Sequence, residues 1–225
     1  LPMGDTRNRH EEAAAAIIRR AAPELFVFTS AEIWPVIREY ERTTTAIING
    51  YVHPRVSDYL DKLEDALRRS GVPAEPLITK SNGGVMSAEL GKTSCVNMVL
   101  SGTASGVIGG AFVARACGVE NAVTLDIGGT SADVAVVIDG APQYGMGEKI
   151  GEFPLYIPSV SVTSIGEGGG SIARVDEFGV LKVGPESAGS DPGPACYGQG
   201  GERPTISAAF AVSGFLGHHD LAYNS

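Results

Sequence analysis

The chain has 225 residues, of which 43% are hydrophobic and 19% are charged, a composition typical of a globular protein with a substantial buried core. The formal net charge of -9 argues against a nucleic-acid partner, because binding to a phosphate backbone requires clustered Lys and Arg. The sequence has no apolar run of about eighteen residues, so no membrane span is expected. Its three widely spaced cysteines favour reduced thiols in a cytoplasmic protein over a disulfide framework.

Glycine is unusually frequent. The chain holds 30 glycines, nearly twice the usual share of roughly 7%, and most of them follow residue 80. The chain also begins at Leu1 without an initiator Met. We therefore expect this chain to be a piece of a longer polypeptide.

Residues 1–118 are expected to be mainly helical with short strands. Helix formers with acids early and arginines late predict a first helix, and three-to-four spacing of apolar residues predicts a longer helical region punctuated by Pro35 and Pro54. A small-residue stretch closed by Gly118 predicts another helix. The expected helices cover residues 8–22, 31–70 and 101–118, and the expected strands cover 25–30 and 76–84.

The character changes to β after Val119. Alternating apolar residues between glycine turns predict strands, among them a hairpin with Glu177 to Gly179 near its turn. These strands cover residues 122–129, 131–140, 155–166 and 171–184. A Gly/Pro-rich loop over 187–204 and a final short helix over 206–217 complete the chain. The pattern predicts an α/β or α+β layered fold.

The segment DIGGTSAD carries the strongest chemical signal. A strand delivers Asp126 at its end, where a carboxylate can approach a metal. Gly128 and Gly129 lack Cβ atoms, so their backbone can approach phosphate oxygens closely. The candidate site therefore comprises, in chain order, Asp126, Gly128, Gly129, Thr130, Ser131 and Asp133. The alternative is an ordinary hairpin with an Asp-x-Gly-Gly turn.

Two further glycine clusters are candidate ligand-binding loops by composition. The segment GEGGGS includes Gly168, Gly169 and Gly170, which permit close backbone approach to a ligand, although a flexible connection would have the same composition. The segment SNGG places Asn82 and Gly83 after a strand, and a simple turn explains it equally well.

The chain resembles the hydantoinase/5-oxoprolinase family over nearly its full length. Six segments occur in the family's order, which makes chance similarity untenable. They are REYERTTTAIINGYVHP (38–54), SNGGVMS (81–87), LSGTASGVIGGA (100–111), DIGGTSADVAVV (126–137), IGEGGGSIARVD (165–176) and VGPESAGSDPGPACYGQGG (183–201).

The resemblance implies an α/β, actin-like (ribonuclease H-like) ATPase fold, with a mixed sheet, flanking helices and two lobes that each carry a DxGGT hairpin. Residues 1–225 would form one lobe, and the N-terminal lobe would be absent. ATP and Mg²⁺ are the implied cofactors, held between the lobes, with Asp126 near the metal. A single lobe is then expected to bind nucleotide weakly.

Three departures from the family pattern bear on the site. Many relatives carry an Asp-x-His pair where this chain has Ser161 and Thr163, and hydroxyls are poor ligands for a transition metal. Relatives usually carry an Asp at the position of Ala208, and often a Pro at that of Thr103.

The resemblance implies part of an ATP-dependent hydrolase that opens a cyclic amide of the hydantoin or 5-oxoproline type. Asp126 and Asp133 would be its catalytic carboxylates. The alternative is a non-catalytic or ATP-binding subunit of a carboxylase-type complex. Expected partners are a small cyclic amide, the missing lobe, and a second subunit or further copies of the chain.

Overall fold

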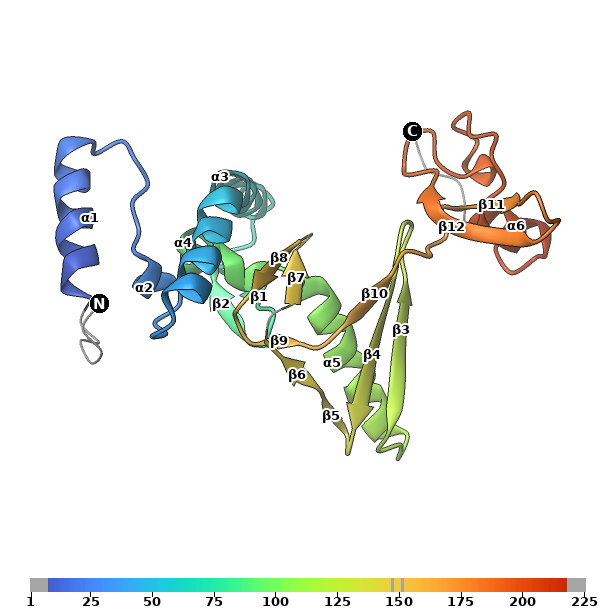
Figure 1. Ribbon diagram of the computed structural model, residues 1–225, viewed down its shortest axis with the longest axis horizontal. Coiled ribbons are helices and arrows are strands. Elements are labelled where there is room, and N and C mark those ends of the chain that lie inside the picture. The colour runs from blue at the N-terminus through green and yellow to red at the C-terminus, as the bar shows by residue number, and fades with distance from the viewer. Residues whose placement is uncertain (1–7, 147, 151, 218–225) are drawn as a thin grey trace. The chain divides into compact units, whose positions relative to one another are not determined.

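A computed structural model describes residues 8–146, 148–150 and 152–217 (Figure 1). The chain folds into two compact units, each described separately. Unit 1 comprises Leu1–Gly109 and Pro142–Ser161, and unit 2 comprises Gly110–Ala141 and Val162–Ser225. No helix in the described part is long and apolar enough to cross a membrane.

The helices of the first half are largely those that the sequence predicts. The helix expected over 31–70 is interrupted at Pro35, while Pro54 lies inside its second part without ending it. The short helix α4 and the 3₁₀ helix η1 were not expected. The helices are α1 (Arg9–Ala21), α2 (Ser30–Ile33), α3 (Glu39–Arg69), α4 (Ala88–Thr93), η1 (Cys95–Met98) and α5 (Ser101–Ala116).

The strand predicted over residues 25–30 is wrong. Thr29 instead caps α2: its hydroxyl accepts a hydrogen bond from the Glu32 N–H, and the Glu32 carboxylate accepts one from the Thr29 N–H. This capping box satisfies main-chain groups that a strand would need a partner to satisfy. Phe28, which is outside any strand, packs its side chain against the core of unit 1.

The core of unit 1 joins α2 and α3 to the segment around β8. Its buried members are Ile33, Ile48, Val96, Leu155 and Ile157. The strands around it form short antiparallel pairs: β1 (Leu77–Thr79) with β2 (Val85–Ser87), β6 (Tyr144–Gly145) with β9 (Ser159–Val160), and β7 (Glu148–Ile150) with β8 (Phe153–Leu155).

Asn49 ties α3 to the helices that follow β2. This fully buried amide donates from Nδ2 to the carbonyl of Thr93 (3.0 Å) and accepts at Oδ1 from the N–H of Val96 (3.0 Å). The two bonds satisfy main-chain groups near the junction of α4 and η1, where the helix ends would otherwise leave them unpaired.

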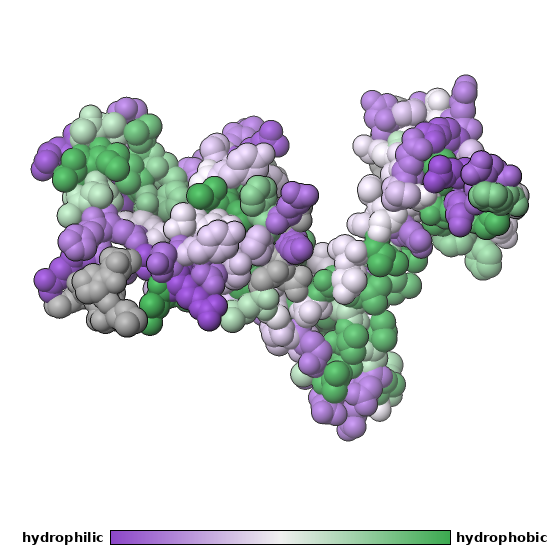
Figure 2. Space-filling model, in the orientation of Figure 1, coloured by the Kyte–Doolittle hydropathy of each residue, from purple (hydrophilic) through white to green (hydrophobic). Residues whose placement is uncertain are grey.

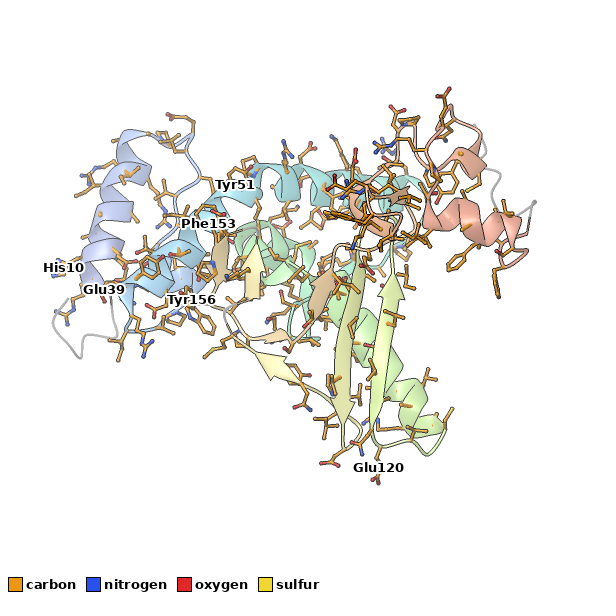
Figure 3. All side chains as sticks on the ribbon, turned by 45° about the vertical axis from the view of Figure 1, so that its right-hand side comes forward. His10, Glu39, Tyr51, Glu120, Phe153 and Tyr156 are labelled. Atoms are coloured by element: carbon orange, nitrogen blue, oxygen red, sulfur yellow. The ribbon has the colours of Figure 1, made fainter. Side chains whose placement is uncertain are left out.

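Unit 2 is built on the predicted hairpin. Strand β3 (Ala122–Ile127) pairs antiparallel with β4 (Ala132–Ile138), which pairs antiparallel with β10 (Thr163–Ile165). Strand β5 (Ala141–Pro142) lies beside β4. Glu120 marks the end of this hairpin opposite its glycine turn (Figure 3).

A second part of unit 2 follows β10. The predicted hairpin over 171–184 is present as β11 (Ser171–Val175) and β12 (Leu181–Ser187), with an antiparallel register. The loop that follows contains the 3₁₀ helix η2 (Ala195–Tyr197). The final helix α6 (Ile206–Val212) is shorter than expected, because the helix ends before Gly214, which has a positive φ.

The two faces of the β3–β4 hairpin differ. On one face Thr124 lies against α5, where a Cβ on Gly110 would come within 2.5 Å of its methyl group. On the other face Val123, Leu125 and Ile127 are each more than half exposed, and Figure 2 shows hydrophobic surface over this hairpin. On the same face of β4, by contrast, Ala132 is buried.

Candidate functional site

The turn between β3 and β4 brings the predicted hairpin residues together. Asp126 and Asp133 are directly opposite each other in the strand register, and Ile127 is opposite Ala132. Residues 128–131 form the turn, closed by a hydrogen bond from the Gly128 N–H to the Ser131 carbonyl (2.9 Å). Since opposed residues project to the same face of a sheet, the two aspartates share one face.

Three successive main-chain N–H groups lie open in this turn. Within the part of the chain that the structure describes, the N–H groups of Gly129, Thr130 and Ser131 donate no hydrogen bond to the protein. A Cβ on Gly129 would meet no atom within 4 Å. Consecutive amides of this kind form an anion-binding concavity, and the missing side chain leaves room for an oxyanion.

The second glycine cluster packs directly onto this turn. The N–H of Gly169 donates to the carbonyl of Gly128 (2.9 Å), and the N–H of Gly170 donates to the carbonyl of Gly129 (2.6 Å). We call these two bonds, together with residues 166–171, the glycine clasp. Two of the turn's carbonyls, those of Gly128 and Gly129, are thereby occupied.

Only glycine fits at positions 168 and 170 of the clasp. A Cβ on Gly168 would lie 2.6 Å from the main-chain nitrogen of Thr130, and one on Gly170 would lie 2.7 Å from the carbonyl oxygen of Gly129. Both positions are buried. The amides of Gly169 and Gly170 are committed to the turn, so these glycines support the turn through their main chain.

Three serines behind the clasp were not among the predicted site residues. The hydroxyl of Ser171, which is fully buried, accepts from the N–H of Gly168 (2.8 Å). The N–H of Ser207 at the start of α6 donates to the carbonyl of Gly169 (2.7 Å). Ser187 lies close to Gly170. Small hydroxyl residues beside a glycine run were the available sequence signal.

Ala208 lies in the first turn of α6, which Thr205 caps. The Ala208 N–H donates to the hydroxyl of Thr205, the N-cap residue, across 3.2 Å. The methyl side chain of Ala208 supplies no carboxylate, so the capped helix end contributes main-chain contacts to the clasp and no acid.

Asn82 and Gly83 belong to unit 1, whereas the hairpin and the clasp belong to unit 2. Their local structure is a tight turn between β1 and β2. Oδ1 of Asn82 accepts from the N–H of Gly84 (3.0 Å), and Gly83 has a φ of +81°. The conformation of the turn alone therefore accounts for both residue types.

The metal-binding capacity of the described residues is limited. They contain no group of three His, Cys, Asp or Glu side chains placed to hold an ion. Thr163 is one of the two hydroxyl residues at the expected Asp-x-His position. It is opposite Val134, while its neighbour Ser164 is opposite Asp133. Ser164, which was not predicted, is thus the hydroxyl on the aspartate face.

A cavity of about 340 Å³ lies in the Gly/Pro-rich loop after β12, with Arg203 in its wall. Arg203 binds Glu186 through both guanidinium Nη atoms, at 2.5 and 2.7 Å. Hydrogen bonding to Arg203 lowers the pKa of the Glu186 carboxyl. Because the guanidinium is already paired, it is a weak candidate for binding an anionic ligand.

A family model described as hydantoinase/oxoprolinase matches residues 42–224. The chain belongs to this family. It is 38% identical over 207 residues to the caprolactamase subunit alpha of Pseudomonas jessenii, a match that covers 92% of this chain and 30% of that protein. The resemblance inferred from the six segments is confirmed.

Two solved structures share the fold. A nucleotide-free structure of an acetone carboxylase, studied for ATP-dependent acetone carboxylation, aligns with a TM-score of 0.76 at 30% identity over 94% of this chain. The ATP-dependent caprolactamase from Pseudomonas jessenii aligns with a TM-score of 0.73 at 38% identity, also over 94%. The expected α/β class is confirmed. This chain spans about 30% of the length of each.

Proposed function

We propose that this chain is one lobe of an actin-like ATPase that opens a cyclic amide with the help of ATP. The observation that supports this most strongly is the clasped turn, with three open N–H groups beside two facing aspartates. Two matched enzymes are ATP-dependent by their own descriptions, and one is a caprolactamase. The family to which the chain belongs includes oxoprolinases.

The residues of the turn fit a Mg²⁺-bound triphosphate. The N–H groups of Gly129, Thr130 and Ser131 would bind phosphate oxygens, and the open space beside Gly129 admits them. Asp126 and Asp133 supply the hard carboxylate oxygens that Mg²⁺ prefers. When bound, ATP supplies a phosphoryl group that activates the amide oxygen toward hydrolysis.

The turn would position this chemistry without taking part in bond breaking. The glycine clasp occupies the carbonyls of Gly128 and Gly129, while the N–H groups of Gly129, Thr130 and Ser131 stay available to a phosphate. Lone pairs directed at an anion would repel it, whereas preorganised N–H donors stabilise developing negative charge.

Replacement of Asp126 tests the proposal in the full-length protein. Asp126→Ala should reduce release of ADP, in the presence of 5-oxoproline or caprolactam, by at least about a hundredfold, which corresponds to ~2.7 kcal/mol of transition-state stabilisation. Glu120→Ala at the opposite end of the hairpin is the control and should retain activity. Normal ADP release by Asp126→Ala with an unchanged melting temperature would refute the assignment.

A second candidate is an ATP-binding subunit of a carboxylase. The acetone carboxylase alignment favours it, as do Ser161, Thr163 and Ala208 at positions where relatives carry acids or His. This candidate predicts no ADP release with any cyclic amide. It predicts ADP release that depends on a co-purified partner subunit, bicarbonate and a ketone.

A further inference from the structure

A row of three polar side chains crosses the β10–β4–β3 sheet beside the glycine turn. The register places Ser164 opposite Asp133, and Asp133 opposite Asp126. Side chains at opposed positions project to the same face. One hydroxyl and two carboxylates, each from a different strand, therefore share the face next to the open N–H groups.

Ser164 makes a direct bond within this row. Its Oγ donates to Oδ1 of Asp133 across 2.5 Å. Hydroxyl–carboxylate bonds of about 2.5–2.7 Å are charge-assisted and stronger than those between neutral groups. An Asp side chain has three staggered χ1 rotamers open to it in principle. The bond from Ser164 favours the rotamer that keeps the carboxylate beside β10.

The pairing of Asp133 with Asp126 gives such a bond a role. Like charges at directly opposed positions of a sheet repel each other, so the two aspartates favour rotamers that separate their carboxylates. Binding of a cation at this face requires a defined direction for each. A neutral donor on the third strand fixes one of them without adding a competing charge.

We infer that Ser164 is a positioning residue, whose hydroxyl holds the Asp133 carboxylate in the orientation used with Mg²⁺ and ATP. The inference rests on the proposed function of the hairpin. Thr163, the preceding residue on β10, is opposite Val134 and thus projects to the other face. The strand therefore offers a matched hydroxyl whose removal leaves Asp133 untouched.

The test compares Ser164→Ala, Ser164→Thr and Thr163→Ala in the full-length protein. Steady-state ADP release gives kcat and KM for Mg·ATP, and Mn²⁺ titration followed by electron paramagnetic resonance in the presence of ATP reports metal affinity. For Ser164→Ala we expect kcat to fall about tenfold, with KM for ATP changed less than about twofold and Mn²⁺ bound about fivefold more weakly. Ser164→Thr keeps the hydroxyl and should recover most of kcat.

Several outcomes would overturn the inference. Unchanged kcat and Mn²⁺ affinity in Ser164→Ala, while the wild type turns over ATP, would show that Asp133 needs no anchor. An equal loss in Thr163→Ala, or no recovery in Ser164→Thr, would indicate a general effect on the strand. A wild type that neither binds Mn·ATP nor releases ADP would instead refute the proposed function itself, and the inference with it.

Discussion

Gly168 illustrates how a single missing side chain can hold two loops together. A Cβ at this position would meet main-chain atoms of Thr130 and Ser131 at 2.6–2.7 Å. Main chain cannot move aside as the end of a flexible side chain can, so the loop or the turn must shift. Glycine is required at this position because of the close packing, since the backbone of Gly168 does not have a positive φ.

Gly168→Ala should therefore destabilise unit 2 by about 1–3 kcal/mol, as overpacking of a close contact does. Gly109→Ala is the matched control. Gly109 is an exposed residue of α5 with open space around its Cα, and Ala there should stabilise the helix by about 0.5–1 kcal/mol. Urea denaturation measures both effects, and equal stability changes of the same sign would contradict the contact argument.

Cys95 is a second residue whose behaviour follows from its surroundings. It is fully buried, and its thiol donates to the carbonyl of Lys92 (3.1 Å). Burial raises the pKa of the thiol from its ordinary value of 9.0 to about 11. A buried thiol that stays protonated is a poor nucleophile.

At pH 8, iodoacetamide should modify the exposed Cys117 at least about a hundredfold faster than Cys95 in the native protein, because reaction requires an accessible thiolate. Peptide mass spectrometry after timed labelling measures this, with labelling in urea as the control. The Cys95 contribution to the free energy of unfolding should be constant below pH 9 and fall between pH 9 and about 11, because the unfolded thiol ionises first. Equal labelling rates of the two cysteines would contradict the burial.

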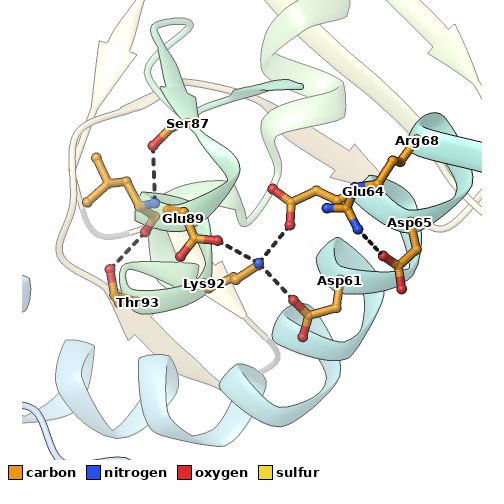
Figure 4. A network of polar contacts seen from close by, with 9 residues as sticks. Asp61, Glu64, Asp65, Arg68, Ser87, Glu89, Lys92 and Thr93 are labelled. Atoms are coloured by element: carbon orange, nitrogen blue, oxygen red, sulfur yellow. Dashed lines mark hydrogen bonds and ion pairs between the residues drawn. The ribbon is translucent and has the colours of Figure 1, made fainter. Parts of the chain in front are cut away.

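At the scale of elements, the α3–α4 junction depends on one ammonium group. Nζ of Lys92 in α4 contacts carboxylate oxygens of Asp61 and Glu64 in α3 and of Glu89 in its own helix, at 2.7–2.8 Å (Figure 4). Hydrogen bonds, first of all to Asp61, raise the pKa of Lys92 above its usual range. Without Lys92 three carboxylates would face one another.

Lys92→Ala should lower the melting temperature several-fold more than Lys62→Ala. Lys62 makes a single pair with Asp58 on the same helix, and its side chain is 74% exposed, against 15% for Lys92. Exposed i,i+4 pairs contribute only about 0.3–0.5 kcal/mol. Calorimetry at low and high salt checks the cause. The deficit of Lys92→Ala should shrink in 1 M NaCl, which screens the repulsion between the carboxylates, and a salt-independent deficit would point to lost packing instead.

The sequence predicts some elements better than others for physical reasons. The glycine-turn hairpin was predicted because strand alternation coincides with clear turn signals, and α5 because a small-residue stretch is closed by Gly118. The strand expected around Phe26 was wrong, because a short apolar run has no strand character without a partner. The role of Ser164 could not be predicted. The register between β10 and β4 decides which residue of β10 lies opposite Asp133, and the sequence does not reveal that register.

At the scale of the whole molecule, the chain covers about 30% of the length of its ATP-dependent relatives. If phosphates are bound from two sides, one lobe supplies only part of the binding free energy. The apolar side of β3 is in keeping with this, since Val123, Leu125 and Ile127 are each more than half exposed.

The 225-residue chain alone should therefore bind Mg·ATP on the order of tenfold or more weakly than the full-length protein, a difference of ~1.4 kcal/mol or more. Isothermal titration calorimetry with both proteins measures this, and Asp126→Ala in each is the control for binding at the hairpin. Equal affinities would show that the phosphates need no second lobe.

The glycine clasp has a consequence for how the site can be observed. Its two hydrogen bonds join main-chain N–H groups to main-chain carbonyls, so the amide hydrogens themselves are the groups to observe. The amide hydrogens of Gly169 and Gly170 are already bonded before any nucleotide arrives. Their exchange with deuterated solvent should be slow in the free protein, while that of the Gly129 amide should be fast and slow down only when an anion binds. In one spectrum, the amides of Gly169 and Gly170 would then serve as the reference, and the amide of Gly129 would report anion binding.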